Sequence, residues 1–240
     1  MVSLPLLVAG LWGVWRLAKS EEATGRRLWL FAATVMLALS AMPPCTSWAA
    51  KSLPNHMVSH IVLMFFIPIG LVLSGEVPPL TKRVHPLIPI LVLNVAMVAM
   101  HLPAVFDRTM SSDVLRTLVV EPLFVGTGVW FFTVVLAPTS HARAIKLRWQ
   151  LIGVISTTVV MFVLAMSMSI FTKTAWYSSM ASMPGMTMPG DFHSQQLAAA
   201  ILWICGDIWA VPIFVWLIRQ VAKRDGSLLA SLDRYASPSR

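Results

Sequence analysis

The stretch HMVSHIVLMFFIPIGLVLSG, residues 56–75, runs for 20 positions without an Asp, Glu, Lys or Arg. A helix of about 20 residues crosses the roughly 30 Å hydrocarbon core of a bilayer. Other apolar runs are bounded by charge, Pro and Gly, and together they predict helices at 3–19, 28–43, 56–75, 86–103, 117–137, 151–172 and 196–219. The sequence therefore predicts an all-α, polytopic membrane protein built as a seven-transmembrane-helix bundle.

Composition supports this class, because 57% of the 240 residues are hydrophobic and only 12% are charged. Too few polar residues remain to cover a soluble globule. The net charge of +8 does not indicate nucleic-acid binding, since the basic residues lie in short loops rather than on one continuous face. Cys45 and Cys205 are not expected to form a disulfide. Pro68 and Pro89 fall inside the third and fourth predicted spans, where we expect kinks.

The distribution of Lys and Arg predicts the orientation of the chain. Fourteen of these residues fall on one side of the predicted spans, and four, Lys51, Arg108, Arg116 and Lys173, fall on the other. Because basic loops stay cytoplasmic, the N-terminus is expected outside and the C-terminus inside. The first apolar run lacks a preceding basic residue and should not be cleaved. The predicted organisation is a transmembrane domain, 1–220, followed by a basic cytoplasmic tail, 221–240.

Histidines gather at the predicted outer ends of the spans. His56 and His60 lie four residues apart and share a helix face, and Met64 continues this face one turn deeper. The fourth span runs outward and ends at His101, with Met97 one turn below it. We expect these side chains to form a metal site. Ordinary interfacial histidines, hydrated by water and headgroups, are the alternative interpretation.

A methionine-rich loop is predicted on the same side of the membrane. Its prolines and glycines argue against a packed helical stripe of methionines. Imidazole and thioether groups together favour a soft ion, above all copper(I). The predicted ligands from this loop are Met183, Met186, Met188 and His193, beside Met180, and Cys45 is a weaker candidate.

Further polar residues are candidates for supporting roles. Asp207 lies near the middle of the seventh predicted span and Asn94 near the middle of the fourth. Such residues often mark ion or proton paths, although an Asp–Asn hydrogen bond would serve structure alone. Asp107 and Glu121, on the outer side, could attract a cation or a basic partner, or be ordinary solvated charges.

Three strings resemble the bacterial CtaG family of multi-span cytochrome c oxidase assembly factors. They are HMVSHIVLM at residues 56–64, HLPAVFD at 101–107 and QQLAAAILW at 195–203. The resemblance covers roughly residues 35–220 and implies a seven-helix protein of the bacterial plasma membrane that helps to metallate a haem–copper oxidase.

Carried over position by position, the resemblance makes His56, His60 and His101 the candidate copper ligands, and Gln195 and Gln196 motif members without a defined role. Family members often have a Glu-His pair where this chain has Glu121-Pro122, so one histidine is missing here. The expected partners are an oxidase subunit and the lipid bilayer, whereas a periplasmic copper chaperone and a second copy of the chain stay open.

The preferred hypothesis is a copper-binding assembly factor that is not an enzyme. Met57 occupies the position where a zinc protease of the His-Glu-x-x-His type needs its glutamate, and the sequence has no nucleophile elbow, P-loop or dinucleotide fingerprint. Two alternatives remain. One is a haem-binding membrane redox protein, and the other is a copper permease that uses the Met loop, His56, His60, Asn94 and Asp207 in succession.

Overall fold

The computed structural model describes residues 2–19, 24–78, 84–136, 147–177 and 192–224, and every regular element in these ranges is helical. The elements are α1 (Leu4–Lys19), α2 (Thr24–Ala41), α3 (Pro43–Ala49), α4 (Leu53–Ile61), the π-helical turn η1 (Val62–Phe66), α5 (Ile67–Leu73), α6 (Leu87–His101), α7 (Pro103–Met110), α8 (Asp113–Leu115), the π-helical turn η2 (Arg116–Val120), α9 (Glu121–Val135), α10 (Leu147–Ser169) and α11 (Phe192–Arg224).

Four continuous helical stretches in the described part of the chain are long and apolar enough to cross a membrane: Leu53–Leu73, Asp113–Val135, Leu147–Ser169 and Phe192–Gln220. Two bent pairs, α2 with α3 and α6 with α7, raise the number to six if each pair is one span. A helix lies at each of the seven predicted places, but α1 has only 16 residues. The all-helical prediction is confirmed, and the described residues contain four to six candidate spans rather than a clear seven.

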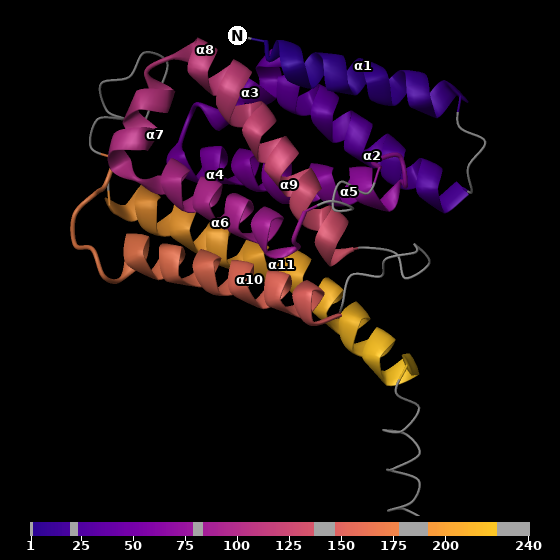
Figure 1. The fold of residues 1–240 in the computed structure, drawn as a ribbon. Helices are drawn as coiled ribbons and strands as arrows, with labels where there is room; N and C mark the ends of the chain where they lie inside the picture. The colour runs from indigo at the N-terminus through magenta and orange to yellow at the C-terminus, as the bar shows by residue number, and fades with distance from the viewer. Residues whose placement is uncertain (1, 20–23, 79–83, 137–146, 178–191, 225–240) are drawn as a thin grey trace, which may run out of the picture.

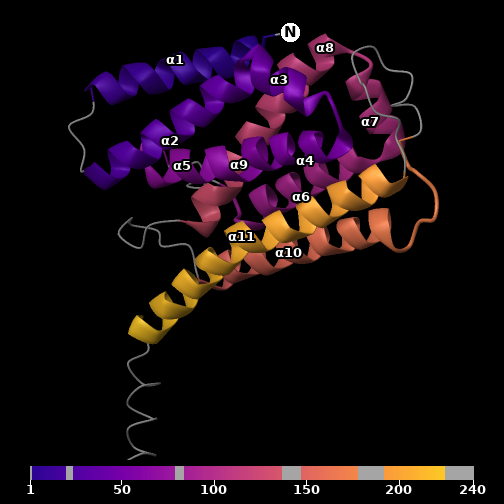
Figure 2. The same ribbon diagram turned by 180° about the vertical axis from the view of Figure 1, so that it is seen from behind.

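The helices form three layers (Figure 1). Helices α1 and α2 pack together on one side of the molecule, and α10 and α11 pack together on the opposite side. Between them lie α4, α5, α6 and α9, and the view from behind shows the same order (Figure 2). Aromatic side chains fill the middle of the bundle, where the Trp209 indole stacks on Phe65 with ring centroids 5.0 Å apart. α11 continues to Arg224, past the predicted start of the tail at 221, and residues 225–240 lie outside the described part.

The two bends of more than 40° lie elsewhere than at the two prolines where kinks are predicted. Pro89 lies in the first turn of α6, where a helix does not need the missing N–H, and Pro68 lies within a continuous candidate span. The chain bends instead by 70° before Pro43 and by 78° before Pro103. The residues preceding these prolines have extended backbones, because proline disfavours the helical conformation of its predecessor.

A proline follows each π-helical turn after one intervening residue. Ile67 N–H bonds to Val62 and Glu121 N–H bonds to Arg116, five residues back in both cases, and the next residue is Pro68 or Pro122. Proline cannot donate to the carbonyl four residues earlier, so a widened turn is a natural accommodation. His60 lies two residues before the first turn, and Glu121 directly follows the second.

Close packing of α9 on η1 depends on a glycine. A Cβ added at Gly128 would overlap the carbonyl oxygen of Met64, whose usual helical donor, the N–H four residues later, is missing because residue 68 is proline. Glycine thus permits the backbone contact that holds the two helices together at this depth.

Candidate functional site

His56 and His60 lie on one face of α4 with ring centroids 4.1 Å apart. The helix starts at a defined point, because the Ser52 hydroxyl oxygen accepts a hydrogen bond from Asn55 N–H and Pro54 occupies the first turn. This start places both imidazoles within the first three turns. The predicted sharing of a face is confirmed.

His101, the last residue of α6, completes a group of three imidazoles that we call the histidine cluster (His56, His60 and His101). Its ring centroid lies 6.4 Å from that of His60. Nδ1 of His101 lies 2.7 Å from the Met97 carbonyl oxygen, so Nδ1 carries the proton and donates. In the neutral ring Nε2 is then a bare lone pair, and it lies 3.3 Å from Sδ of Met57.

Aromatic side chains enclose the histidine cluster. Phe106 meets His56 edge-on with centroids 5.4 Å apart, and Phe124 meets His60 at 4.6 Å. The Tyr177 hydroxyl donates to the carbonyl oxygen of His101 over 2.9 Å. Burial raises the pKa of Tyr177, and the Asp107 carboxylate raises it further, so the phenol stays a donor. The cluster is consequently shielded on the side of α7 and α9.

A cavity of about 250 Å³ lies beside the α4 histidines. Its polar lining includes His56, His60, Cys45, Arg116 and Glu121. Three buried atoms of these side chains have no hydrogen-bond partner among the described residues, namely His56 Nε2, His60 Nδ1 and Glu121 Oε2. Buried polar atoms are nearly always paired, so three unpaired atoms around one cavity indicate a place for something else.

Met57 is the sulfur that sequence reasoning missed. Consecutive helical residues point about 100° apart, so Met57 does not lie on the helix face that carries His56, His60 and Met64. The predicted sulfur ligands Met64 and Met97 are buried, and it is the carbonyl oxygen of Met97 that contacts His101. The position of Met57 becomes informative only when α6 is placed beside α4.

Of the remaining predicted residues, none that the structure describes joins the cluster. His193 is exposed in the first turn of α11 and is not part of the cavity lining. Met183, Met186 and Met188 lie outside the described residues. Gln195 is buried and holds backbone groups, accepting from Trp176 N–H and donating to the Met168 carbonyl, while exposed Gln196 reaches Ser169. Cys45 and Cys205 are free thiols, as expected.

An Asp–Asn pair is absent from the described part of the bundle. The Asn94 amide donates instead to the Thr157 hydroxyl and to the Ile90 carbonyl, whereas Asp207 is exposed on α11. The prediction of a structural Asp207–Asn94 hydrogen bond was wrong. The pairing was predicted from the similar depths of Asp207 and Asn94 in the membrane, and depth does not determine which face of a helix carries a residue.

The donor groups do not form a finished metal cage. Within the described ranges, no group of three or more His, Cys, Asp or Glu side chains is arranged closely enough to hold a metal ion. The structure thus shows three neighbouring imidazoles and one thioether with unsatisfied atoms. It does not show a closed coordination sphere.

Comparison with known proteins identifies the family. Searches of curated proteins and of solved structures give no match. The family model described as cytochrome c oxidase caa3 assembly factor (Caa3_CtaG) matches residues 8–224, which is most of the chain. This protein, a bundle of apolar helices that encloses a histidine cluster, therefore belongs to the CtaG family of cytochrome c oxidase assembly factors.

Proposed function

We propose that the protein contributes to oxidase assembly by carrying a copper(I) ion as cargo at the histidine cluster and Met57, and by passing it to an oxidase subunit. The assembly role follows from the family, and copper is the further step. The protein holds and releases the ion without catalysing a reaction. Imidazole nitrogen and thioether sulfur suit copper(I), and the hard oxygen donors preferred by magnesium or calcium are few here.

The observation that carries this proposal is the pattern of unsatisfied atoms. His101 Nε2 and Met57 Sδ face each other across 3.3 Å, and with the proton on Nδ1 neither atom has a hydrogen to share. Two lone-pair donors pointed at one another gain little until a cation comes between them. His56 Nε2 and His60 Nδ1 are also unpaired in the same region. These four atoms are the donors that a soft cation bound in this region could use.

The cavity supplies access to this cluster. His56 and His60 belong to its lining, so an ion that arrives through it meets their free nitrogens before it reaches His101. Glu121 and Cys45 in the same lining could assist capture, as a carboxylate offsets the charge of the ion and a thiol is a soft donor. Weak donors such as thioethers favour later release to a partner.

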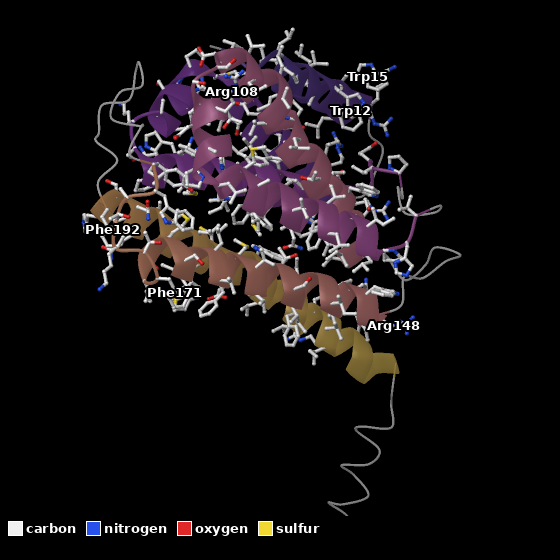
Figure 3. The ribbon with its side chains drawn as sticks, turned by 60° about the vertical axis from the view of Figure 1, so that its left-hand side comes forward. Trp12, Trp15, Arg108, Arg148, Phe171 and Phe192 are labelled. Carbon is white, nitrogen blue, oxygen red and sulfur yellow. The ribbon has the colours of Figure 1, made fainter. Side chains whose placement is uncertain are left out.

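We further propose that α1, the four continuous spans and the two bent pairs each cross the bacterial plasma membrane, which gives seven crossings, with the cluster at the extracytoplasmic end. Basic residues number fourteen against four on the two sides, as counted above. The end of α1 has the features of an interface anchor, since Lys19 lies over the Trp15 ring at 4.6 Å. Figure 3 shows Trp12 and Trp15 at this end of α1, and Arg148 at the end of α10 opposite Phe171.

Labelling of single cysteines tests the orientation. In a chain with Cys45→Ser and Cys205→Ala, a cysteine placed at exposed Ser111 follows α7, and one placed at exposed His85 precedes α6. An impermeant maleimide applied to intact cells should label Ser111→Cys and spare His85→Cys until the cells are opened. The reverse pattern would reject the proposed orientation.

Copper retention tests the cargo. Full-length protein, loaded with Cu(I) under anaerobic conditions and passed through a weak chelating column, should retain about one copper ion per chain. His56→Ala combined with His60→Ala should lower the copper retained per chain at least tenfold. His85→Ala removes an exposed histidine far from the cluster and serves as the matched control. Retention by the double variant equal to wild type would refute the site.

Neither alternative from the sequence gains a specific observation. The permease relay needed Asn94 and Asp207 on one path, but Asn94 is engaged with Thr157 and Asp207 is on the exposed face of α11. For the haem hypothesis, Phe106 and Phe124 pack directly against the imidazoles that would flank a macrocycle. A visible spectrum of the purified protein decides, because bound haem would give a strong band near roughly 410 nm.

A further inference from the structure

Asp207 lies at the middle of a membrane span. The candidate span of α11 runs from Phe192 to Gln220, so 15 residues separate Asp207 from one end and 13 from the other. At about 1.5 Å per residue, both ends are roughly 20 Å away. The half-thickness of the hydrocarbon core is about 15 Å, so this carboxyl group is close to the bilayer midplane.

The side chain of Asp207 faces outward rather than into the bundle. Its neighbours along the outer face of α11 are apolar, with Ile204 60% exposed, Ile208 53% and Val211 55%. Within the described residues Asp207 has no hydrogen bond or ion pair. Such a face belongs to the lipid or to another membrane protein.

Asp207 borders a shallow groove between α10 and α11. The groove, with a volume of about 190 Å³, is lined by Thr158, Val159, Met161, Phe162, Trp203, Gly206 and Asp207. The Trp203 and Phe162 rings meet edge-on, with centroids 5.1 Å apart, beside this groove. A helix that docked in this groove would pack against its apolar walls and would meet one carboxyl group, that of Asp207.

An unpaired carboxyl at this depth is costly. Ionisable residues inside a bilayer almost always face the bundle interior and pair with each other or with backbone groups. Asn94, the partner considered from the sequence, uses its Nδ2 group for Thr157 and the Ile90 carbonyl, and it forms no hydrogen bond with Asp207. The bundle itself therefore leaves the Asp207 carboxyl without an internal partner in its described part.

We propose that the α10/α11 groove is a docking site for one transmembrane helix of another protein, and that this helix places a basic side chain against Asp207. A helix is the form of backbone that satisfies its own hydrogen bonds in lipid, and a basic group is the charge complement of a carboxylate. A second copy of this chain fits less well, because a two-fold contact through this groove would bring two Asp207 carboxyls together.

Binding of synthetic helices tests this proposal independently of copper. Full-length protein carrying a donor fluorophore is placed in phosphatidylcholine vesicles with acceptor-labelled polyleucine helices of about 20 residues. One peptide has a central lysine and its control has leucine there. The lysine peptide should bind the wild type at least tenfold more tightly than the leucine peptide does, and Asp207→Leu should abolish this preference. Because leucine suits a lipid-facing position, the variant should fold and retain copper as the wild type does.

Three outcomes would overturn the proposal. Equal binding of both peptides would make the groove unselective, and an unchanged preference in Asp207→Leu would locate the contact elsewhere. Energy transfer between two labelled copies of the chain that disappears in Asp207→Leu would assign the groove to self-association. The copper retention measured for the histidine variants plays no part in any of these results.

Discussion

Gln195 and His56 are both buried polar side chains, 1% and 5% exposed, yet their surroundings differ. Gln195 uses both ends of its amide, with Trp176 N–H 2.6 Å from Oε1 and the Met168 carbonyl 2.7 Å from Nε2. His56 leaves Nε2 without a partner, as does Nδ1 of neighbouring His60. A satisfied group stabilises the fold, whereas an unsatisfied one costs free energy that a ligand can recover. Burial alone does not separate structural polar residues from candidate ligands, but hydrogen bonding does.

The largest effect is expected from the satisfied residue. Gln195→Leu would leave the Trp176 N–H and the Met168 carbonyl unpaired in the interior, at a cost of about 1 to 3 kcal/mol each. We expect a total loss of about 3 kcal/mol, visible as a lower unfolding temperature in detergent. Gln196→Leu is the matched control, because Gln196 is exposed and its contact with Ser169 is long, 3.4 Å. Equal stability of the two variants would contradict a structural role for Gln195.

A smaller effect, confined to copper, is expected at Met57. Met57→Leu keeps volume and apolarity, so the fold should lose less than about 1.5 kcal/mol. The variant lacks the thioether that faces His101, and we expect about tenfold weaker Cu(I) binding, which is about 1.4 kcal/mol. Competition with a Cu(I) chelator measures this change. Met161→Leu, a buried methionine beside Gly206, is the control and should bind copper normally. Wild-type affinity in Met57→Leu would exclude the sulfur as a ligand.

The smallest effect on stability is expected at His56 in copper-free protein. His56→Leu replaces a buried nitrogen without a partner by hydrocarbon, and such replacements are nearly neutral or stabilising. We expect the unfolding free energy to change by less than about 1 kcal/mol, together with loss of copper retention. If His56→Leu lowered the unfolding free energy of the copper-free protein by several kcal/mol, His56 would have a structural partner. Its role would then not differ from that of Gln195.

Prediction from sequence succeeded where a local pattern is sufficient. Helix positions follow from apolar runs, and the pairing of His56 with His60 follows from their spacing of four residues. The family resemblance drawn from three strings is confirmed by the match over residues 8–224. The sequence did not predict the two sharp bends, which precede Pro43 and Pro103 at the ends of predicted spans, nor the π-helical turn before Pro68.

Prediction failed where the direction of a side chain depends on a neighbouring helix. Asp207 and Asn94 have similar depths, but rotation of α11 turns Asp207 outward while Asn94 bonds to Thr157 on α10. His193 was grouped with the cluster because it lies on the same side of the predicted membrane, and it is exposed at the start of α11. Membrane depth alone does not predict a site, because the rotation of each helix and its position beside its neighbours also decide which side chains meet.

The amino-acid sequence by itself determined that this chain is a membrane-embedded helical protein of the CtaG family, and that His56 and His60 share a helix face. Both facts depend on hydrophobicity and on the 3.6-residue period of a helix, which are local properties. Only the tertiary structure brought His101 to Met57, placed Glu121 and Cys45 in the cavity with His56, and turned Asp207 outward. These relations depend on how helices pack and rotate against one another, because contacts between distant segments are fixed by the whole bundle.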